Sequence, residues 1–167
     1  MRNSILFPIG VFLMGLLLGS AIPASLAQGN RLIGMNGVNH VGINVENFDE
    51  AMAFYTQKMG FREAFTVRDG NGQPTLGYVQ VSRNTFVELQ PANGNRAPGI
   101  SHVGLHVEDI RATIASLKQR GVTVEEARVS SSTQAMLANV TGPGGVRIEL
   151  SELTPESLQR KAMEGWR

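Results

Sequence analysis

The sequence contains no cysteine among its 167 residues, which excludes disulfide bonds, thiolate metal sites and a cysteine nucleophile. Histidine is also scarce, with three in the chain, and aromatic side chains make up only 6% of it. Neither sign of charge dominates, since 15 basic residues stand against 14 acidic ones. This balance gives no electrostatic reason to expect nucleic acid or an anionic membrane as a partner. The folded part must be stabilised by packing alone, which a chain of this length can achieve.

Long apolar runs are absent except for one at the start of the chain. Residues 5–22 are largely apolar and follow a single charge, Arg2, while Ser25 and Ala27 precede a plausible cleavage point before Gln28. These three parts are typical of a secretory signal peptide covering residues 1–27. An uncleaved membrane anchor is the alternative, although proline and glycines interrupt the run. We therefore expect a periplasmic or secreted protein that has no membrane contact after cleavage.

The rest of the chain is an internal repeat. "NHVGINVE" begins at Asn39, and "SHVGLHVE" begins at Ser101. Each copy continues with a turn, an amphipathic helix that ends at a glycine (Gly60, Gly121) and three strand candidates. Asn47 is the expected N-cap of the first helix. In the first copy the strand candidates are 62–69, 75–82 and 85–90, and in the second they are 122–129, 135–140 and 146–151.

This pattern predicts an α+β fold of two tandem βαβββ modules in a single domain, residues 28–153. Module 1 covers about 36–92 and module 2 about 99–153, joined by a linker over 91–99. Residues 154–167 predict a C-terminal helix, with Thr154 as its N-cap.

Strand alternation assigns side chains to the two faces of the sheet. In the first strand Val41, Ile43 and Val45 are expected to pack against the helix, so His40 faces the other side, and the same phase applies to His102 in the second copy. The alternation in 85–90 and 146–151 puts Glu88 and Glu149 on the face of the histidines. Glu88 follows His40 by 48 residues, and Glu149 follows His102 by 47.

These four side chains form a candidate metal site. Each alone is more often an ordinary strand residue, but the same residue types recur at the same offsets on the same face. Modules related by a pseudo-twofold axis would bring His40, Glu88, His102 and Glu149 together in a cleft. Imidazole with carboxylate suits one divalent Zn, Fe, Ni, Co or Mn ion.

"NHVGINVENFDEAMAFYTQKMGF", "SHVGLHVED" and "GPGGVRIEL" resemble the vicinal oxygen chelate superfamily, also called the glyoxalase/bleomycin resistance/dioxygenase superfamily. The resemblance covers about residues 35–153 and implies paired βαβββ modules that form a curved sheet around a divalent metal. It carries the ligand positions over to His40, Glu88, His102 and Glu149. The complete set resembles glyoxalase I most, because methylmalonyl-CoA epimerases usually have glutamine at the position of Glu88. Asn44 stands where glyoxalase I typically has an arginine that holds glutathione.

The resemblance implies a lyase or isomerase that binds two neighbouring substrate oxygens and stabilises an enediolate. Glu88 and Glu149 are the expected catalytic groups, one of them taking the proton. Three-ligand members keep the position of Glu149, which is therefore expected to be the permanent ligand. Side chains on the same open face are candidate substrate contacts: His106, Asn44, Tyr78, Phe86 and Arg147.

Two alternatives stay open at this point. An Fe(II) extradiol-type dioxygenase would use His40, His102 and Glu149 as a facial triad. A non-catalytic periplasmic ligand-binding or resistance protein would share the fold without the chemistry. In each case the expected partner is a small molecule, and a homodimer is compatible with the modules.

Overall fold

The computed structural model describes Leu32 and residues 34–167, and the predicted signal peptide with its cleavage point lies outside these residues. Ile33–Arg167 form one compact unit. Within the described part of the chain, none of the helices has both the length and the apolar character needed to cross a membrane.

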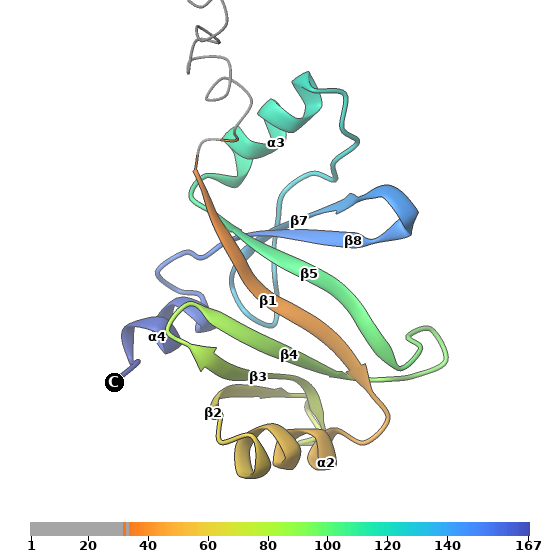
Figure 1. Cartoon of the computed structure of the whole chain (residues 1–167), viewed down its shortest axis with the longest axis vertical. Helices are drawn as coiled ribbons and strands as arrows, with labels where there is room; N and C mark the ends of the chain where they lie inside the picture. Colours follow the sequence, from red (N-terminus) through yellow and green to blue (C-terminus); the bar gives the residue numbers. More distant parts are fainter. Residues whose placement is uncertain (1–31, 33) are drawn as a thin grey trace, which may run out of the picture. The chain divides into compact units, whose positions relative to one another are not determined.

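A single curved sheet of eight strands organises this unit (Figure 1). Its spatial order is β2-β3-β4-β1-β5-β8-β7-β6. Module 1 supplies β1 (Met35–Val45), β2 (Arg62–Arg68), β3 (Pro74–Ser82) and β4 (Thr85–Pro91), and module 2 supplies β5 (Gly99–Val107), β6 (Arg128–Val129), β7 (Met136–Thr141) and β8 (Arg147–Glu152).

The two modules have the same internal topology. β1 pairs in parallel with β4, and β5 pairs in parallel with β8. The modules join through an antiparallel contact of β1 with β5, in which Val41 lies opposite Val103. The predicted α+β class and paired βαβββ modules are therefore confirmed.

Helices α2 (Phe48–Ala53) and α3 (Ile110–Gln119) follow β1 and β5, and a π-helical turn over Phe54–Lys58 extends α2. The side chains of Asn47 and Asp109 cap them by accepting N–H bonds from Glu50 and Ala112. Asn47 is the predicted cap. Gly60 and Gly121 follow these helices with positive φ, the usual conformation at such ends.

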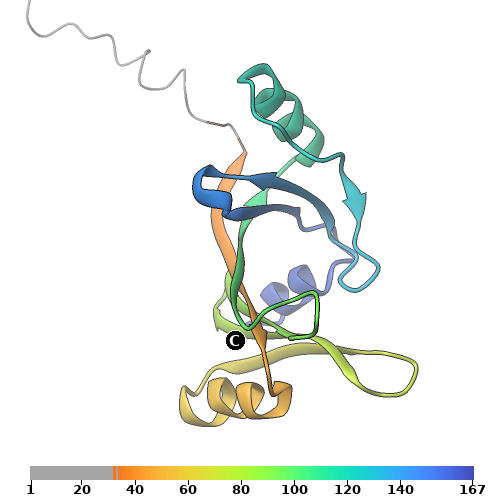
Figure 2. The same ribbon diagram turned by 90° about the vertical axis from the view of Figure 1, so that its right-hand side faces the viewer.

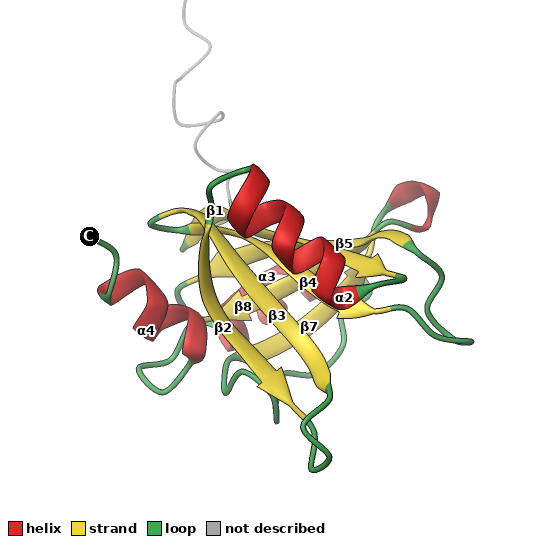
Figure 3. Ribbon diagram, turned by 90° about the horizontal axis from the view of Figure 1, so that it is seen from below, coloured by secondary structure: helices red, strands yellow, loops and turns green. Residues whose placement is uncertain are grey.

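The sheet has an outer face, against which α2 and α3 lie (Figure 3). Its inner face carries the four predicted ligands. On the outer face Ile110 and Ile114 of α3 pack with Val107 and Leu150. Under α2, Phe48 and Met52 lie against Gly77, where an added Cβ would come within 2.6 Å of either side chain.

The side chains of β1 that were expected to pack against the helix are less buried than predicted. Val41, Ile43 and Val45 are only half-buried, whereas His40, Gly42 and Asn44 on the opposite phase are buried. The reason is that α2 and α3 cover the outer strands and leave the central pair, β1 and β5, thinly covered. Val38 on this central strip is 52% exposed.

Helix α4 (Leu158–Glu164) packs on the inner face, between the strands of the two modules (Figure 2). Its Ala162 lies in an apolar cluster with Leu76, Tyr78 and Phe86. Ser157 caps the helix by accepting the N–H of Arg160, so the predicted cap at Thr154 is wrong. The Thr154 hydroxyl instead donates to the carbonyl of Gln134.

The strand predicted over 122–129 is much shorter, because only Arg128–Val129 pair continuously with β7. Val124 makes a single bridge to Val140 and turns into the core beside α3. The exposed Glu126 pairs with Lys118 of α3 instead of extending the sheet edge.

Candidate metal site

The four predicted ligands meet at the centre of the inner face, and we call them the four-ligand cluster (His40, Glu88, His102, Glu149). One ligand atom from each lies within 4.8 Å of the others, and all four residues are buried. The two Nε2 atoms of His40 and His102 are 2.9 Å apart. Glu88 Oε2 lies 3.4 Å and Glu149 Oε1 3.5 Å from His40 Nε2.

Each histidine ring lies over a glycine of the other module. In the antiparallel pairing of β1 with β5, His40 stands opposite Gly104 and Gly42 stands opposite His102. A Cβ at Gly104 would lie 2.1 Å from Cε1 of His40, and one at Gly42 would lie 2.0 Å from Cε1 of His102. The histidine of each copy therefore requires the glycine in the "HVG" of the other copy. The repeated glycine was visible in the sequence, but its role beneath the histidine ring was not predicted.

His40 is fixed in the tautomer that suits a metal ligand. The Asn39 amide nitrogen donates to the carbonyl of Asn84, so the Asn39 oxygen faces His40 Nδ1 at 3.1 Å. This oxygen can only accept, which assigns the proton to Nδ1 and leaves the Nε2 lone pair facing the cluster. Burial lowers the pKa of His40 to about 4, which keeps the ring neutral at neutral pH.

His102 has a different environment. The Arg147 guanidinium lies 2.6 Å and the Ser101 hydroxyl 2.9 Å from its Nδ1. Because a guanidinium only donates, Nδ1 accepts this bond and Nε2 carries the proton toward His40. Ligation through Nε2 requires the other tautomer, and the Ser101 hydroxyl is positioned to accept a bond from a protonated Nδ1.

The Glu88 carboxylate is anchored at both oxygens. The Tyr78 hydroxyl donates to Oε2, and the Gln90 amide donates to Oε1. Burial alone raises the pKa of Glu88, but the nearby imidazoles of His102 and His40 and the Tyr78 hydroxyl outweigh it and lower this pKa to about 2. Burial and the Glu88 charge raise the pKa of Tyr78 well above its ordinary value, so its hydroxyl remains a donor.

The Glu149 carboxylate is held less firmly. Outside the four-ligand cluster its contacts are the Ser151 hydroxyl at 3.3 Å and the Arg147 guanidinium at 3.8 Å. Burial raises the pKa of Glu149, and the Glu88 carboxylate raises it further against the opposing effects of the His102 ring and the Arg147 guanidinium. The pKa of Glu88 is thus lowered and that of Glu149 raised, and such a separation is expected of two carboxylates in an acid–base site.

The donor set fits a divalent metal ion. Two imidazoles and two carboxylates match the preferences of Zn, Ni, Co, Mn and Fe, and the Gly42 and Gly104 positions leave the rings the room they need. Four buried ligand groups this close together would otherwise leave charges and lone pairs poorly compensated.

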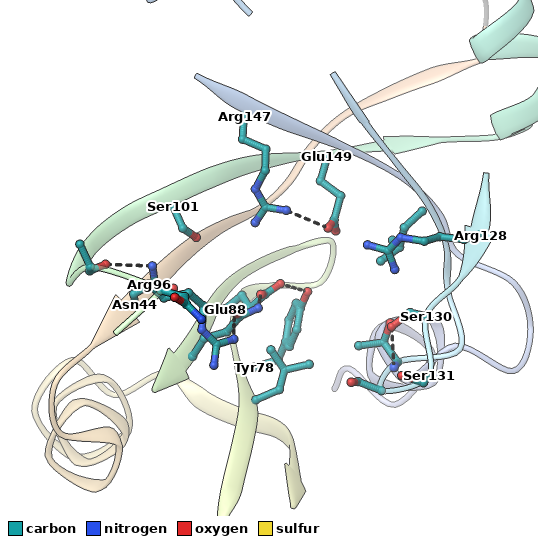
Figure 4. A pocket seen from close by; sticks show the side chains of 17 residues that line it. Asn44, Tyr78, Glu88, Arg96, Ser101, Arg128, Ser130, Ser131, Arg147 and Glu149 are labelled. Carbon is teal, nitrogen blue, oxygen red and sulfur yellow. Dashed lines mark hydrogen bonds and ion pairs between the residues drawn. The ribbon is translucent and has the colours of Figure 1, made fainter. Parts of the chain in front are cut away.

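A polar cavity of about 640 Å³ opens beside the cluster. Figure 4 shows Glu88 and Tyr78 at its base, Arg96 and Asn44 on one side, and Arg128 with Ser130 and Ser131 on the other. Glu88 and Glu149 line it directly, so a molecule in the cavity reaches both carboxylates. A volume of this size is typical of small-molecule sites.

The predicted substrate contacts divide into two groups. Asn44, Tyr78 and Arg147 line the polar cavity. Phe86 instead packs under α4 with Ala162.

His106 is separated from the cavity along its own strand. It lines a different pocket, together with Arg160 and Glu108. Four strand residues carry it about 13 Å beyond His102. Burial and the nearby Arg160 charge lower its pKa.

Sequence reasoning missed several residues of the cavity wall. Arg96 lies in the linker between the modules, and Arg128 precedes the run "SSST" at residues 130–133, which also lines the cavity. The run of hydroxyl residues can be seen in the sequence, but no local sequence pattern indicates that the β6–β7 loop faces module 1.

Comparison with known proteins identifies the family. The family model described as "Glyoxalase/Bleomycin resistance protein/Dioxygenase superfamily" matches residues 37–150. The chain is 29% identical over 119 residues to a probable lactoylglutathione lyase of Synechocystis, covering 66% of this chain and 91% of that protein. It is 27% identical over 128 residues to the uncharacterized protein YaeR of Escherichia coli, covering 72% and 99% of the two chains.

A solved structure agrees with these relatives. The crystal structure of methylmalonyl-CoA epimerase from Mycobacterium tuberculosis superposes with a TM-score of 0.63 at 25% identity, covering 76% of this chain and 95% of that one. Homologues of this chain thus include lyases and epimerases, and members of the family use divalent metals. The repeated modules, the buried ligand cluster and these similarities show that the chain belongs to the glyoxalase/bleomycin resistance protein/dioxygenase superfamily.

Proposed function

We propose that this protein is an exported, metal-dependent lyase or isomerase that removes and returns a proton next to a carbonyl group of a small substrate. The observation that carries the proposal is the buried four-ligand cluster at the base of a polar cavity. When bound, a divalent ion would polarise two neighbouring substrate oxygens and stabilise the negative charge that forms after proton removal. His40, Glu88, His102 and Glu149 would hold it.

The contacts around the two carboxylates support different roles. Glu88 is fixed by Tyr78 and Gln90, which suits a permanent ligand. Glu149 has fewer contacts and a raised pKa, which suits the group that accepts the substrate proton on a carboxylate oxygen and delivers it back. This assignment reverses the sequence-based expectation that Glu149 is the permanent ligand.

The four-ligand set also supports this reaction class over an Fe(II) oxygenase. A facial triad would leave Glu88 outside the coordination shell. Here Glu88 Oε2 is as close to His40 Nε2 as Glu149 Oε1 is, at 3.4 Å against 3.5 Å, and it is held there by two hydrogen bonds.

Metal analysis with matched variants tests the proposal. Wild-type protein reloaded with Zn or Ni is expected to retain about one ion per chain after desalting, and Glu88→Ala and His102→Ala to retain far less. His106→Ala is the matched control, because this third histidine lines a separate pocket, and it should retain the ion. Wild-type protein that keeps less than about a tenth of an ion per chain would exclude the metal enzyme.

Deuterium exchange tests the reaction itself. Metal-loaded wild-type protein in deuterated water should exchange the proton at the carbon beside the carbonyl in a member of a panel of 2-oxo and 2-hydroxy compounds, as followed by NMR. Glu149→Gln should bind metal but lose exchange by roughly 100-fold or more. Exchange that survives in Glu149→Gln would remove this residue from the proton-transfer role.

Export rests on the signal predicted over residues 1–27. Protein purified from its host should begin at Gln28, as determined by mass spectrometry. A first residue of Met1 would contradict cleavage.

A further inference from the structure

We infer that the substrate carries a carboxylate or phosphate group in addition to its chelating oxygens, and that Arg96 and Arg128 bind this anionic group across the polar cavity. The inference rests on the proposed function and names the class of substrate: a small anionic molecule whose opposite end carries two neighbouring oxygens.

Arg128 presents its guanidinium group to the polar cavity. Its guanidinium belongs to β6, lines the polar cavity and is exposed. Among the described residues, none forms a hydrogen bond or an ion pair with this guanidinium group, so its N–H donors are available. A guanidinium presents a planar set of donors that matches carboxylate and phosphate oxygens.

The charges of the cavity wall are unevenly placed. Arg96, Arg128 and Arg147 line the cavity, and its acidic residues, Glu88 and Glu149, both belong to the four-ligand cluster. A divalent ion held by that cluster would compensate the two carboxylates. The guanidinium groups of Arg96 and Arg128 would then face a cavity without acidic side chains to neutralise them, which favours an anionic ligand.

Arg96 is connected to the catalytic centre through Gln90. Its Nη1 donates to Gln90 Oε1 at 2.9 Å, and the same amide donates to Glu88. Arg96 is therefore oriented by a side chain that also fixes a ligand, which places an anion bound at Arg96 in register with the cluster.

Hydroxyl groups next to Arg128 add further donors. The loop after β6 is fixed by bonds from Ser130 N to the Ala135 carbonyl at 2.8 Å and from Thr133 N to Ser130 Oγ at 3.1 Å. The N–H of Leu158 also donates to the Thr133 carbonyl at 2.9 Å, which joins the loop to α4. The exposed hydroxyls of Ser131 and Ser132 line the cavity on this fixed loop.

An unpaired buried acceptor on the cavity wall supports a ligand in the cavity. The Asn44 amide nitrogen donates to the Ala97 carbonyl at 2.9 Å, which turns Oδ1 away from it. This Oδ1 has no hydrogen-bond partner although Asn44 is only 8% exposed, and Asn44 lines the cavity. A buried acceptor without a partner is costly, and a hydroxyl or amide of the substrate would satisfy it.

Hydroxamates test the inference because they chelate metal ions through two neighbouring oxygens. Zn-loaded wild-type protein is titrated calorimetrically with butyrohydroxamic acid, which has an uncharged tail, and with succinic monohydroxamic acid and phosphonopropanohydroxamic acid, which have anionic tails. We expect the anionic tails to bind roughly 10- to 100-fold more tightly, because charged hydrogen bonds to guanidinium groups are formed. A larger gain for the phosphonate would indicate a phosphate ester, and a larger gain for the carboxylate a carboxylic acid.

Arginine variants locate the effect. Arg128→Gln and Arg96→Gln should each reduce by about tenfold the ratio of the affinity for an anionic tail to the affinity of the same variant for butyrohydroxamic acid. The ratio is used because Arg96 also contacts Gln90, which holds Glu88. Arg111→Gln, an exposed arginine on α3, is the matched control and should keep the full preference.

The outcomes separate this inference from the proposed function. Equal affinity for charged and uncharged tails would overturn the anionic substrate and leave the metal site intact. A preference that survives both Arg128→Gln and Arg96→Gln would overturn the assignment to these residues. If no hydroxamate binds the Zn-loaded protein, both the proposed function and the inference fail.

Discussion

The two modules hold the same ligands in different surroundings. His40 and Glu88 of module 1 are supported by Asn39, Tyr78 and Gln90 through hydrogen bonds that fix a tautomer and both carboxylate oxygens. In module 2, His102 and Glu149 share the half-exposed guanidinium group of Arg147, and Glu149 has a further, longer contact with the Ser151 hydroxyl. Hydrogen bonds thus fix the orientation of the module 1 ligands, whereas the module 2 ligands have fewer contacts that fix them.

The modules also differ in what covers their matching positions. Phe86 and Arg147 each precede a ligand glutamate by two residues, but Phe86 lies under α4 while Arg147 lines the polar cavity. Asn44 and His106 are another matching pair, and only Asn44 lines the cavity. Helix α4 therefore occupies one half of a nearly symmetric cleft, and the polar cavity occupies the other half.

The largest expected effect comes from replacing the glycine that lies under each histidine ring, a feature that the two modules share. Gly104→Ala should displace His40 and Gly42→Ala should displace His102, because the new Cβ would overlap a buried imidazole. Each should weaken Zn binding by about 100-fold or more, measured by competition with a chelator. Gly70→Ala, where an added Cβ meets nothing within 4 Å, is the control. Normal Zn affinity in Gly104→Ala would show that His40 is not a ligand.

A smaller effect should sharpen the difference between the two carboxylates. Tyr78→Phe leaves one oxygen of Glu88 without its buried donor and should weaken Zn binding by about tenfold. Ser151→Ala removes a long contact to Glu149 and should cost less than about threefold. The measurement is again chelator competition, and the reverse order of the two variants would contradict the assignment of Glu88 as the firmly held ligand.

The smallest effect concerns the matching helix caps. Asn47→Ala and Asp109→Ala each remove a side chain that accepts an N–H bond at the start of α2 or α3. Each should lower the free energy of unfolding by about 1 kcal/mol in urea titrations. Asn47→Ser and Asp109→Ser retain an acceptor and should recover most of this loss. An alanine variant as stable as the wild type would show that the cap of that module contributes nothing.

Much of the fold was predictable because each copy of the repeat contains local sequence patterns that specify strands, helix caps and helix ends. The "HVG" strands, the cap at Asn47 and the glycines after both helices lie where their sequence patterns put them. Strand alternation also put His40, Glu88, His102 and Glu149 on one face, and the structure brings these side chains together.

The remainder depended on contacts between distant segments. Burial of Phe86 could not be predicted because it comes from α4, which packs across the inner face from more than 70 residues away in the sequence. The same helix separates the surroundings of His106 from those of Asn44. Arg128 carried no local mark of its position, since β6 is a short edge strand and its direction is set by pairing with β7.

The crossed seating of the histidines makes each module depend on the other. A polypeptide that ended after β4 would carry His40 and Glu88 but lack the bare backbone of Gly104 on which the His40 ring rests. A polypeptide that began at β5 would have the same deficiency at Gly42. Cutting the chain in the linker would therefore yield two fragments that acquire metal only when they reassemble, so that the ion becomes a reporter of fragment complementation.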